Sequence, residues 1–543
     1  MSDVAAARPP REKAFFGHPK GLQTLFFTEM WERFSYYGMR AFLTIYIATE
    51  VAKGGLGESP ATAGIYYALY GSTIYLVSLP GGWIADRFIG QRMAVLIGGI
   101  IIMFGHITLA LPTHDAFLPG LGLIVLGTGF LKPNVSTIVG QLYDKNDPRR
   151  DAGYTIYYMG INVGALVAPI ACGFLAQSST FRTFLANQGI DPNASWHFGF
   201  GAAAIGMALG VVQFVHGWKY LGDAGAKPAP RTGSASAPMP AAAWIIAAIG
   251  TALIVGASWW IFHDGGLNKG TIADAFGVGL AVLSVVVFII MHQYVAIGDD
   301  ERRRVRAMMV LFLGCLSFFG LFEQAGSTLS FFAEQRVHRT LVGIDFPSSY
   351  YQFINAAFVI LLGPVFAALW IALQRKGKEP TPVTKFSVGM VLISLSFVVL
   401  LPALLGPIAA GHKTTGLWLF AVYFFATTGE LCISPVGLST MNKLAPERLA
   451  GFVMGIWFLA TSVGYYLAGR AEEKLGKLAD KLEIGPAITT VAADGTVSQH
   501  HFAGIFYLLI VFSLVVAAIL YALAGPVKRM LAQGNLPVAK VRK

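Results

Sequence analysis

Long apolar segments alternate with short polar ones along almost the whole chain. A helix needs about 20 mainly apolar residues to cross a membrane, so this alternation predicts a bundle of membrane helices. Fourteen such segments can be marked, near residues 21–49, 60–85, 92–112, 116–140, 153–177, 196–220, 240–262, 271–294, 305–333, 349–374, 385–406, 414–440, 451–470 and 502–525.

The first segment departs from this pattern because charged side chains lie inside it. Helical spacing places residues 29, 33, 36, 37 and 40 on one stripe. A charge at bilayer depth costs about 2.5–3.5 kcal/mol on insertion scales, so these residues predict a water-filled pathway for protons or a charged substrate. The polar side chains of this face are Glu29, Glu32, Arg33, Tyr36, Tyr37 and Arg40.

The composition agrees with a polytopic membrane protein: of 543 residues, 55% are hydrophobic and only 13% are charged. Mean hydropathy is +0.60. The net charge of +11 does not indicate nucleic-acid binding, since the basic residues lie in short loops. Cys172, Cys315 and Cys432 all fall in apolar segments, so we expect packing residues rather than disulfides or metal ligands. We find no nucleotide-binding loop and no nucleophile–base arrangement, which argues against an enzyme.

The loops predict the orientation. One alternate set, which includes the run ERRRVR at residues 301–306, is much richer in Lys and Arg than the opposite set. By the positive-inside rule this set and both termini are cytoplasmic.

A stretch rich in Pro, Ala, Gly and Ser after the sixth segment predicts a linker, and the next two segments contain almost no ionisable residue in their apolar parts. We therefore predict an inserted helical hairpin between two six-helix bundles. The predicted parts are an N-terminal tail (1–20), a first bundle (21–220), a linker (221–239), the hairpin (240–294), a second bundle (295–525) and a C-terminal tail (526–543).

The loop GGWIADRFIGQR, residues 81–92, combines two glycines for close helix packing with Asp86, Arg87 and Arg92. It resembles the G-x-x-x-D-R-x-x-G-x-R loop of the major facilitator superfamily, and the two-bundle layout agrees.

The segment EMWERFSYYG, residues 29–38, looks like the E-x-x-E-R-F-x-Y-Y-G signature of the proton-coupled oligopeptide transporters, a branch of that superfamily. The hairpin resembles the extra helix pair of the prokaryotic members. Further similar segments occur in the family's order: GTGFLKPN (127–134), FEQAGSTL (322–329), QFIN (352–355), GELCISPVG (429–437) and GIWFLA (455–460).

The chain also departs from the family at uncharged positions. Phe319 stands where a tryptophan is common, four residues before Glu323. The fifth segment reads YYMGINVGA and lacks the usual serine, and QFINAAF lacks a proline that often follows the asparagine.

The buried charges predict proton coupling. Glu29, Glu32, Glu323 and Glu430 outnumber Arg33, Arg40 and Lys132 by one, so one bound proton would make the set neutral. Glu29 and Glu32 share Arg33 on one helix face, which makes one of them a candidate to carry that proton. A static ion-pair network is the alternative for these residues. The resemblance implies that Glu323 pairs with Arg40 when ionised.

Arg40 and Lys132 suit a substrate carboxylate, because a guanidinium binds it in bidentate fashion and an ammonium adds a point charge. Pro133 could produce a local irregularity that aims Lys132. By resemblance, Glu430 receives the substrate's α-ammonium. The alternative for Lys132 and Glu430 is a structural salt bridge.

The remaining predicted contacts are uncharged. Asn162 and Asn355 match family asparagines that hydrogen-bond the peptide backbone, with helix–helix packing as the alternative. Tyr36, Tyr37, Tyr75 and Trp457 match positions that line side-chain pockets, although such aromatics also serve packing. We expect His106, a lone histidine, to be a hydrogen-bonded core residue.

We therefore predict a symporter in a bacterial inner membrane that imports di- and tripeptides with protons by alternating access, as a monomer in the lipid bilayer, without cofactor or metal. A proton-coupled carrier for nitrate, an amino acid or a drug keeps the same fold, but a nitrate carrier has no use for Glu430. A receptor or scaffold has no need for seven cavity charges.

Overall fold

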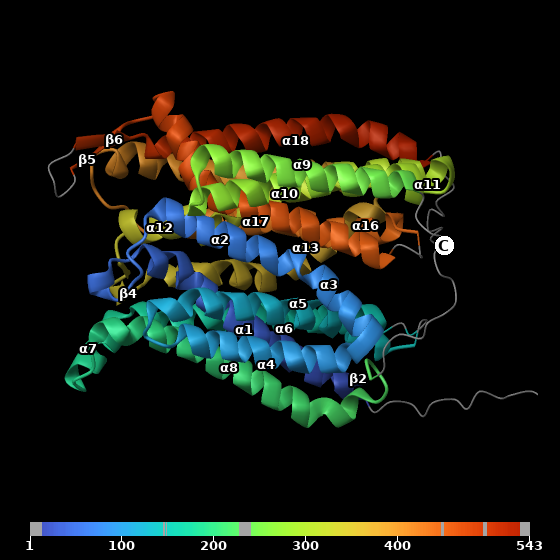
Figure 1. Ribbon diagram of the computed structural model, residues 1–543, viewed down its shortest axis with the longest axis horizontal. Coiled ribbons are helices and arrows are strands. Elements are labelled where there is room, and N and C mark those ends of the chain that lie inside the picture. The colour runs from blue at the N-terminus through green and yellow to red at the C-terminus, as the bar shows by residue number, and fades with distance from the viewer. Residues whose placement is uncertain are drawn as a thin grey trace, which may run out of the picture. The chain divides into compact units, whose positions relative to one another are not determined.

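The computed structural model describes residues 13–144, 147, 149–226, 241–446, 450–491 and 497–532. Each of the fourteen predicted apolar segments is helical in the described residues (Figure 1). Several of them are divided into consecutive helical pieces, among them 60–85, 305–333 and 385–406. Eleven of the described helices are long and apolar enough to cross a membrane by length and composition. Most of the predicted linker and much of both predicted tails lie outside the described residues.

Contacts divide the chain into two compact units. Unit 1 comprises Met1–Ala41 and Val77–Arg231, and unit 2 comprises Phe42–Leu76 and Thr232–Lys543. Residues 42–76 thus group with the second half of the chain rather than with the predicted 21–220 bundle. The predicted domain boundaries remain a prediction.

Unit 1 is built from long helices that pack in pairs: α4 contacts α5 and α8, α6 contacts α8, and α3 contacts α5. The additional helix α7 follows α6. The elements are β1 (Lys13–Phe15), β2 (His18–Pro19), most of α1 (Lys20–Ala48), α3 (Ser78–Ile84), η2 (Ala85–Ile89), α4 (Gln91–Leu109), η3 (His114–Ala116), α5 (Phe117–Gln141), α6 (Arg150–Gln177), α7 (Ser179–Asn187), η4 (Pro192–Ala194), α8 (Ser195–Gly217) and η5 (Trp218–Leu221).

The segment of residues 81–92 runs from α3 through η2 into α4 and packs closely within unit 1. A side chain at Gly81 would meet the carbonyl oxygen of Gly129, so α3 approaches α5 closely there. Gln91 donates a hydrogen bond to Asp86 (2.8 Å). Arg92 donates to the carbonyls of Gly222 and Ala224, which ties the segment after α8 to the start of α4.

Among the described residues, unit 2 contains the second set of long helices and two antiparallel strand pairs. Its elements are η1 (Val51–Lys53), α2 (Pro60–Leu76), α9 (Ala241–Gly265), α10 (Lys269–Ile290), η6 (Met291–Val295), α11 (Gly298–Phe322), η7 (Glu323–Gly326), α12 (Thr328–Arg336), β3 (Thr340–Leu341), β4 (Ile344–Asp345), η8 (Ser348–Gln352), α13 (Phe353–Arg375), α14 (Pro382–Val398), α15 (Leu401–Ala403), η9 (Leu404–Ile408), α16 (Leu417–Leu444), α17 (Ala450–Lys481), β5 (Ile488–Val491), β6 (Val497–His500) and α18 (Phe502–Ala532).

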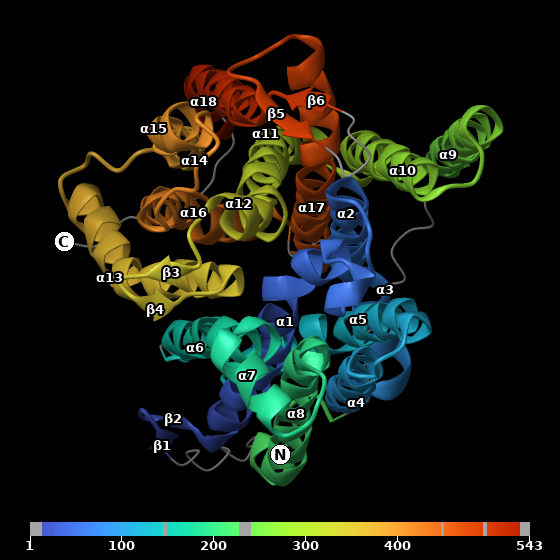
Figure 2. The ribbon, with the colours of Figure 1, turned by 90° about the vertical axis from the view of Figure 1, so that its left-hand side faces the viewer.

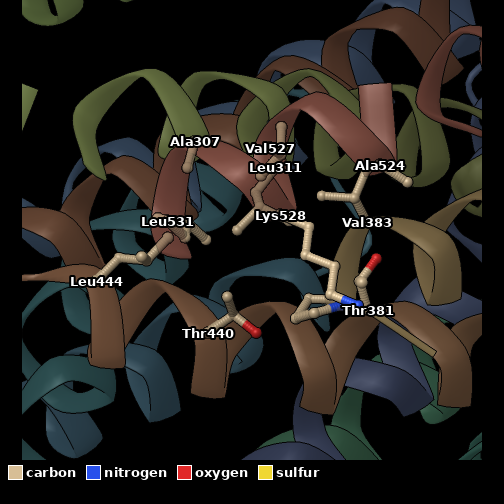
Figure 3. A pocket seen from close by; sticks show the side chains of 11 residues that line it. Ala307, Leu311, Thr381, Val383, Thr440, Leu444, Ala524, Val527, Lys528 and Leu531 are labelled. Carbon is tan, nitrogen blue, oxygen red and sulfur yellow. The ribbon is translucent and has the colours of Figure 1, made fainter. Parts of the chain in front are cut away.

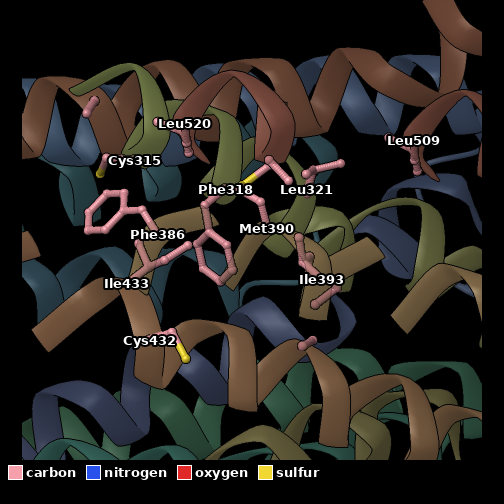
Figure 4. Close-up of a cluster of buried hydrophobic side chains, with 14 of the residues drawn as sticks. Cys315, Phe318, Leu321, Phe386, Met390, Ile393, Cys432, Ile433, Leu509 and Leu520 are labelled. Carbon is pink, nitrogen blue, oxygen red and sulfur yellow. The ribbon is translucent and has the colours of Figure 1, made fainter. Parts of the chain in front are cut away.

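The core of unit 2 lies among α11, α14, α16 and α18, where apolar side chains converge (Figure 4). Phe318, Phe386 and Ile433 are almost fully buried there. Cys315 and Cys432 belong to the same cluster, and all three cysteines of the chain are buried and free. The cysteines are therefore packing residues, as predicted.

Glycines bring α2 and α17 into backbone contact. A Cβ on Gly64 would lie 2.4 Å from the carbonyl oxygen of Gly469, and a Cβ on Gly469 would lie 2.4 Å from that of Gly64. Without a hydrophobic driving force in lipid, helices associate through such close packing of small residues. This contact explains why α2 groups with α17.

The predicted inserted hairpin exists as α9 and α10, which lie side by side (Figure 2). Helix α10 contacts both α2 and α17. Arg470 of α17 donates to Asp274 of α10 (2.9 Å), and Lys474 lies 3.2 Å from the same carboxylate. Lys269, at the start of α10, forms an ion pair with Glu58. The hairpin is thus fastened to unit 2 by ion pairs at one end.

The α2–α17 contact predicts that adding one methyl group at Gly469 destabilises the protein strongly. Gly469→Ala should lower the midpoint of thermal unfolding in detergent, because overpacking costs about 1–3 kcal/mol. Gly256→Ala in α9 is the control, since no described atom lies within 4 Å of the added Cβ. Equal midpoints for the two variants would contradict the contact.

Candidate functional site

The charged groups of α1 form one buried cluster around Arg33. The Arg33 guanidinium contacts Glu32 through two nitrogens, Nη2 donating to Oε1 at 2.6 Å and Nε to Oε2. The Nε atom also lies 3.4 Å from Oε1 of Glu29. All three side chains are buried. Arg33 therefore contacts two carboxylates at once, as the helical spacing predicted. Its contacts with Glu32 are much shorter than its contact with Glu29.

Glu29 receives its second partner from another helix. The Tyr157 hydroxyl of α6 donates to Oε2 of Glu29 at 2.7 Å. Lys132 of α5 also attracts Glu29 electrostatically. Pro133 lies inside α5, directly after Lys132, and the irregularity expected there stays a prediction. Tyr157 was missed in the sequence, where one tyrosine among 20 gives no signal.

Arg40 lies nearly two turns beyond Arg33 on α1 and is buried. Its guanidinium carbon is 5.8 Å from the centre of the Tyr37 ring, and that of Arg33 is 5.0 Å from the Tyr36 ring. Asn162 of α6 donates to the carbonyl of Tyr158 in its own helix (3.1 Å). Unit 1 thus holds Glu29, Glu32, Arg33, Tyr36, Tyr37, Arg40, Lys132 and Asn162.

Glu323 lies in unit 2, where α11 ends and the single turn η7 begins. The Tyr67 hydroxyl of α2 donates to Oε2 of Glu323 at 2.7 Å, and both side chains are buried. Tyr67 is the second residue that sequence reasoning missed.

Side chains satisfy the backbone around this break in the helix. Gln324 donates to the carbonyl of Gly320 (2.9 Å), and Gln352 and Ser330 both donate to that of Ala325. Thr44 donates to the carbonyl of Gly326 (3.0 Å). Irregular backbone at membrane depth requires such internal partners. The turn that carries Glu323 is therefore held on several sides.

Glu430 on α16 is held by Asn355 on α13. The Asn355 amide donates to Oε2 of Glu430 at 2.9 Å and to the Thr427 hydroxyl at 3.0 Å. Glu430 is only partly buried. The structure thus joins two residues that the sequence predicted separately, and it adds Thr427.

The other predicted residues of unit 2 contact aromatic side chains. The Tyr75 ring centre lies 5.3 Å from that of Tyr465 and 6.1 Å from that of Phe458. Trp457 packs edge-on against Phe319, with ring centres 6.4 Å apart. Phe319 thus fills part of the space beside Trp457.

His106 on α4 corrects one prediction. The side chain is fully buried, as expected, but neither ring nitrogen has a hydrogen-bond partner among the described residues. The prediction that His106 is buried is therefore confirmed, and the prediction that it is hydrogen-bonded is wrong.

A cavity of about 120 Å³ opens in unit 2 among α11, α14, α16 and α18 (Figure 3). Its lining is almost entirely apolar and includes none of the predicted site residues. Among the described residues no group of three or more His, Cys, Asp or Glu side chains could hold a metal ion.

Comparison with known proteins places these residues in a family context. The model of the POT family matches residues 92–480. An uncharacterized transporter of Bacillus subtilis, YclF, is 40% identical over 87% of this chain and 92% of its own. A di-/tripeptide transporter of Lactococcus lactis subsp. cremoris is 37% identical over 83% and 88% of the two chains.

A solved structure gives the same result for the fold. The crystal structure of a peptide transporter POT in complex with sulfate superposes with a TM-score of 0.77, at 37% identity, and covers 96% of this chain and 97% of its own. The predicted all-α major facilitator fold is confirmed.

The unequal sharing of Arg33 predicts unequal effects of neutralising its two carboxylates. Glu32→Gln should cost up to about 3–5 kcal/mol of stability, because it removes the close partner of a buried guanidinium. Glu29→Gln should cost about 1 kcal/mol, since Tyr157 can still donate to the amide oxygen. Thermal unfolding in detergent measures both, with the exposed Glu50→Gln as control. Equal losses for Glu32 and Glu29 would contradict the geometry.

Proposed function

This chain belongs to the POT family of membrane transporters, and from that premise we propose that it imports di- and tripeptides together with protons. It is a transporter and not an enzyme. The named peptide transporters among its relatives support the choice of substrate.

One observation carries the proposal: the predicted site charges have opposite signs in the two units. In unit 1, Arg33, Arg40 and Lys132 outnumber Glu29 and Glu32, which leaves one positive charge. In unit 2 the predicted site charges, Glu323 and Glu430, are both negative. A peptide with free ends carries a carboxylate and an ammonium, so it matches this separation of charge.

The proton-coupling role falls to the carboxylates of α1 and η7. Arg33 neutralises Glu32 through two close contacts, whereas Glu29 has one longer contact of 3.4 Å and a hydrogen bond from a neutral tyrosine. Glu29 is therefore the better candidate for carrying a proton in unit 1. Glu323 is the candidate in unit 2, and its protonation would free Arg40 for the substrate.

The substrate-binding role divides in the same way. Arg40 and Lys132 would bind the peptide's carboxylate, with Asn162, Tyr36 and Tyr37 as neighbours. Glu430 would bind the α-ammonium, and Asn355 holds Glu430 in place (2.9 Å). Tyr75 and Trp457 would contact peptide side chains.

The arrangement in the cell completes the proposal. The excess of basic residues in one set of loops supports cytoplasmic termini, and the bacterial relatives support an inner-membrane location. Transport would follow from rocking of one six-helix bundle (21–220) against the other (295–525), with hairpin 240–294 between them in the sequence. We propose a monomer that uses the proton as its only coupling ion.

Reconstituted protein tests the function directly. In proteoliposomes, uptake of labelled dialanine should rise several-fold under an inward proton gradient and return to the basal rate with a protonophore. Unlabelled di- and tripeptides should compete with it, whereas alanine and nitrate should not. Uptake that ignores the gradient, or competition by alanine or nitrate alone, would overturn the proposal.

The amine site has its own test. Glu430→Gln should weaken uptake of a zwitterionic dipeptide about tenfold or more, because a charge-assisted contact to the α-ammonium is lost, and it should change binding of the N-acetylated peptide far less. Asn355 can still donate to the amide oxygen of the new side chain, so the local structure should persist. The exposed Glu50→Gln is the matched control. An equal loss for both peptides would remove the assignment.

A further inference from the structure

Tyr67 is a polar partner of Glu323 that comes from another helix of unit 2. Its hydroxyl donates to Oε2 at 2.7 Å, across 256 positions of the sequence. The tyrosine is 1% exposed and the glutamate 4% exposed. Because both side chains are buried, water does not compete for the carboxylate, and the hydrogen bond is stronger than it would be in water.

Gly326 makes room for this contact. A Cβ at Gly326 would lie 2.2 Å from the Tyr67 hydroxyl oxygen and 2.4 Å from the ring carbon that bears it. Those atoms belong to a rigid ring, so any side chain at position 326 would push the whole phenol away. The Tyr465 ring also packs against Tyr67, with ring centres 5.7 Å apart. The phenol is thus confined to the one position from which it reaches Glu323.

The turn that carries Glu323 is also fixed, because Ser330, Gln352 and Thr44 donate to its backbone carbonyls. Its own Gln324 donates to the carbonyl of Gly320 in α11. Neither partner of the Tyr67–Glu323 bond therefore belongs to a flexible loop. A hydroxyl that served only to join two helices could donate to any backbone carbonyl, as Ser72 of α2 does to Ser462 of α17. Tyr67 donates to a carboxylate instead.

We propose that Tyr67 is a positioning residue for proton transfer at Glu323, an inference that rests on the proposed function. A phenol donates to either form of a carboxyl group, but its bond to the ionised form is about twice as strong. Tyr67 therefore stabilises and orients the carboxylate once its proton has left, without placing a second charge in the interior. Its loss slows the proton-release step and leaves peptide binding intact.

The test compares two transport modes of the full-length protein in proteoliposomes. Uptake driven by an inward proton gradient requires proton release in every cycle, whereas counterflow against internal unlabelled dialanine does not. Tyr67→Phe should lower gradient-driven uptake about tenfold, the effect of losing one hydrogen bond to a charged group. Counterflow should stay within about twofold.

A matched control removes the hydroxyl without removing a bond. Tyr351 of η8 is buried in the same unit, and its hydroxyl has no hydrogen-bond partner among the described residues. Tyr351→Phe should leave both modes unchanged.

A second variant keeps the phenol and moves it. Gly326→Ala should reproduce the selective loss of gradient-driven uptake, because its Cβ displaces Tyr67 from Glu323. Gly363→Ala in α13 should not, since no described atom lies within 4 Å of its Cβ.

The outcomes separate this inference from the function itself. If the unmodified protein fails to couple dialanine uptake to the proton gradient, the proposed function falls. If it couples but Tyr67→Phe leaves gradient-driven uptake unchanged, or lowers both modes equally, the positioning role is overturned and Tyr67 is structural. Folding of each variant is checked by size-exclusion chromatography before reconstitution.

Discussion

The burial of charge inside apolar helices is the constraint on which the rest of this structure depends. An ion removed from water needs close partners of opposite charge, and breaking a buried pair costs several kcal/mol. On α1, the single guanidinium of Arg33 is the partner of two carboxylates. It makes two contacts with Glu32 and one, of 3.4 Å, with Glu29. The sharing is unequal: Glu32 is the closer partner of Arg33 and Glu29 the more distant one.

Buried polar partners on different helices can meet only if the helices approach closely. Glycines make this close approach possible. Gly64 and Gly469 bring the backbones of α2 and α17 together, and Gly326 leaves the space that the Tyr67 ring occupies. Because α2 is held against α17, Tyr67 reaches the break after α11 where Glu323 lies. Packing of uncharged residues therefore decides where a charged one finds its partner.

The sequence predicts the periodic and charged features well and the pairings between distant segments poorly. Hydropathy places all fourteen long helices, and residues 29, 32 and 33 share a face because helical spacing alone puts them there. Tyr157 and Tyr67 could not be found, since a tyrosine that donates to a carboxylate has the same sequence pattern as one that packs against lipid. The same reason hides the lack of a hydrogen-bond partner for His106 among the described residues. It also hides the grouping of α2 with α17, which depends on which helices become neighbours.

Both tyrosines perform one physical task, and it explains why the carboxylates differ. If an arginine is the only partner of a glutamate, protonation strands a buried guanidinium, which is costly. A tyrosine carries no charge, so it keeps a hydrogen bond to the carboxyl group in either form. Glu29 and Glu323 each accept from a tyrosine at 2.7 Å, whereas Glu32 is bound by both arms of Arg33. The hydrogen bond from a neutral tyrosine persists whether or not the carboxyl group carries a proton, whereas neutralising Glu32 would deprive Arg33 of its closer partner.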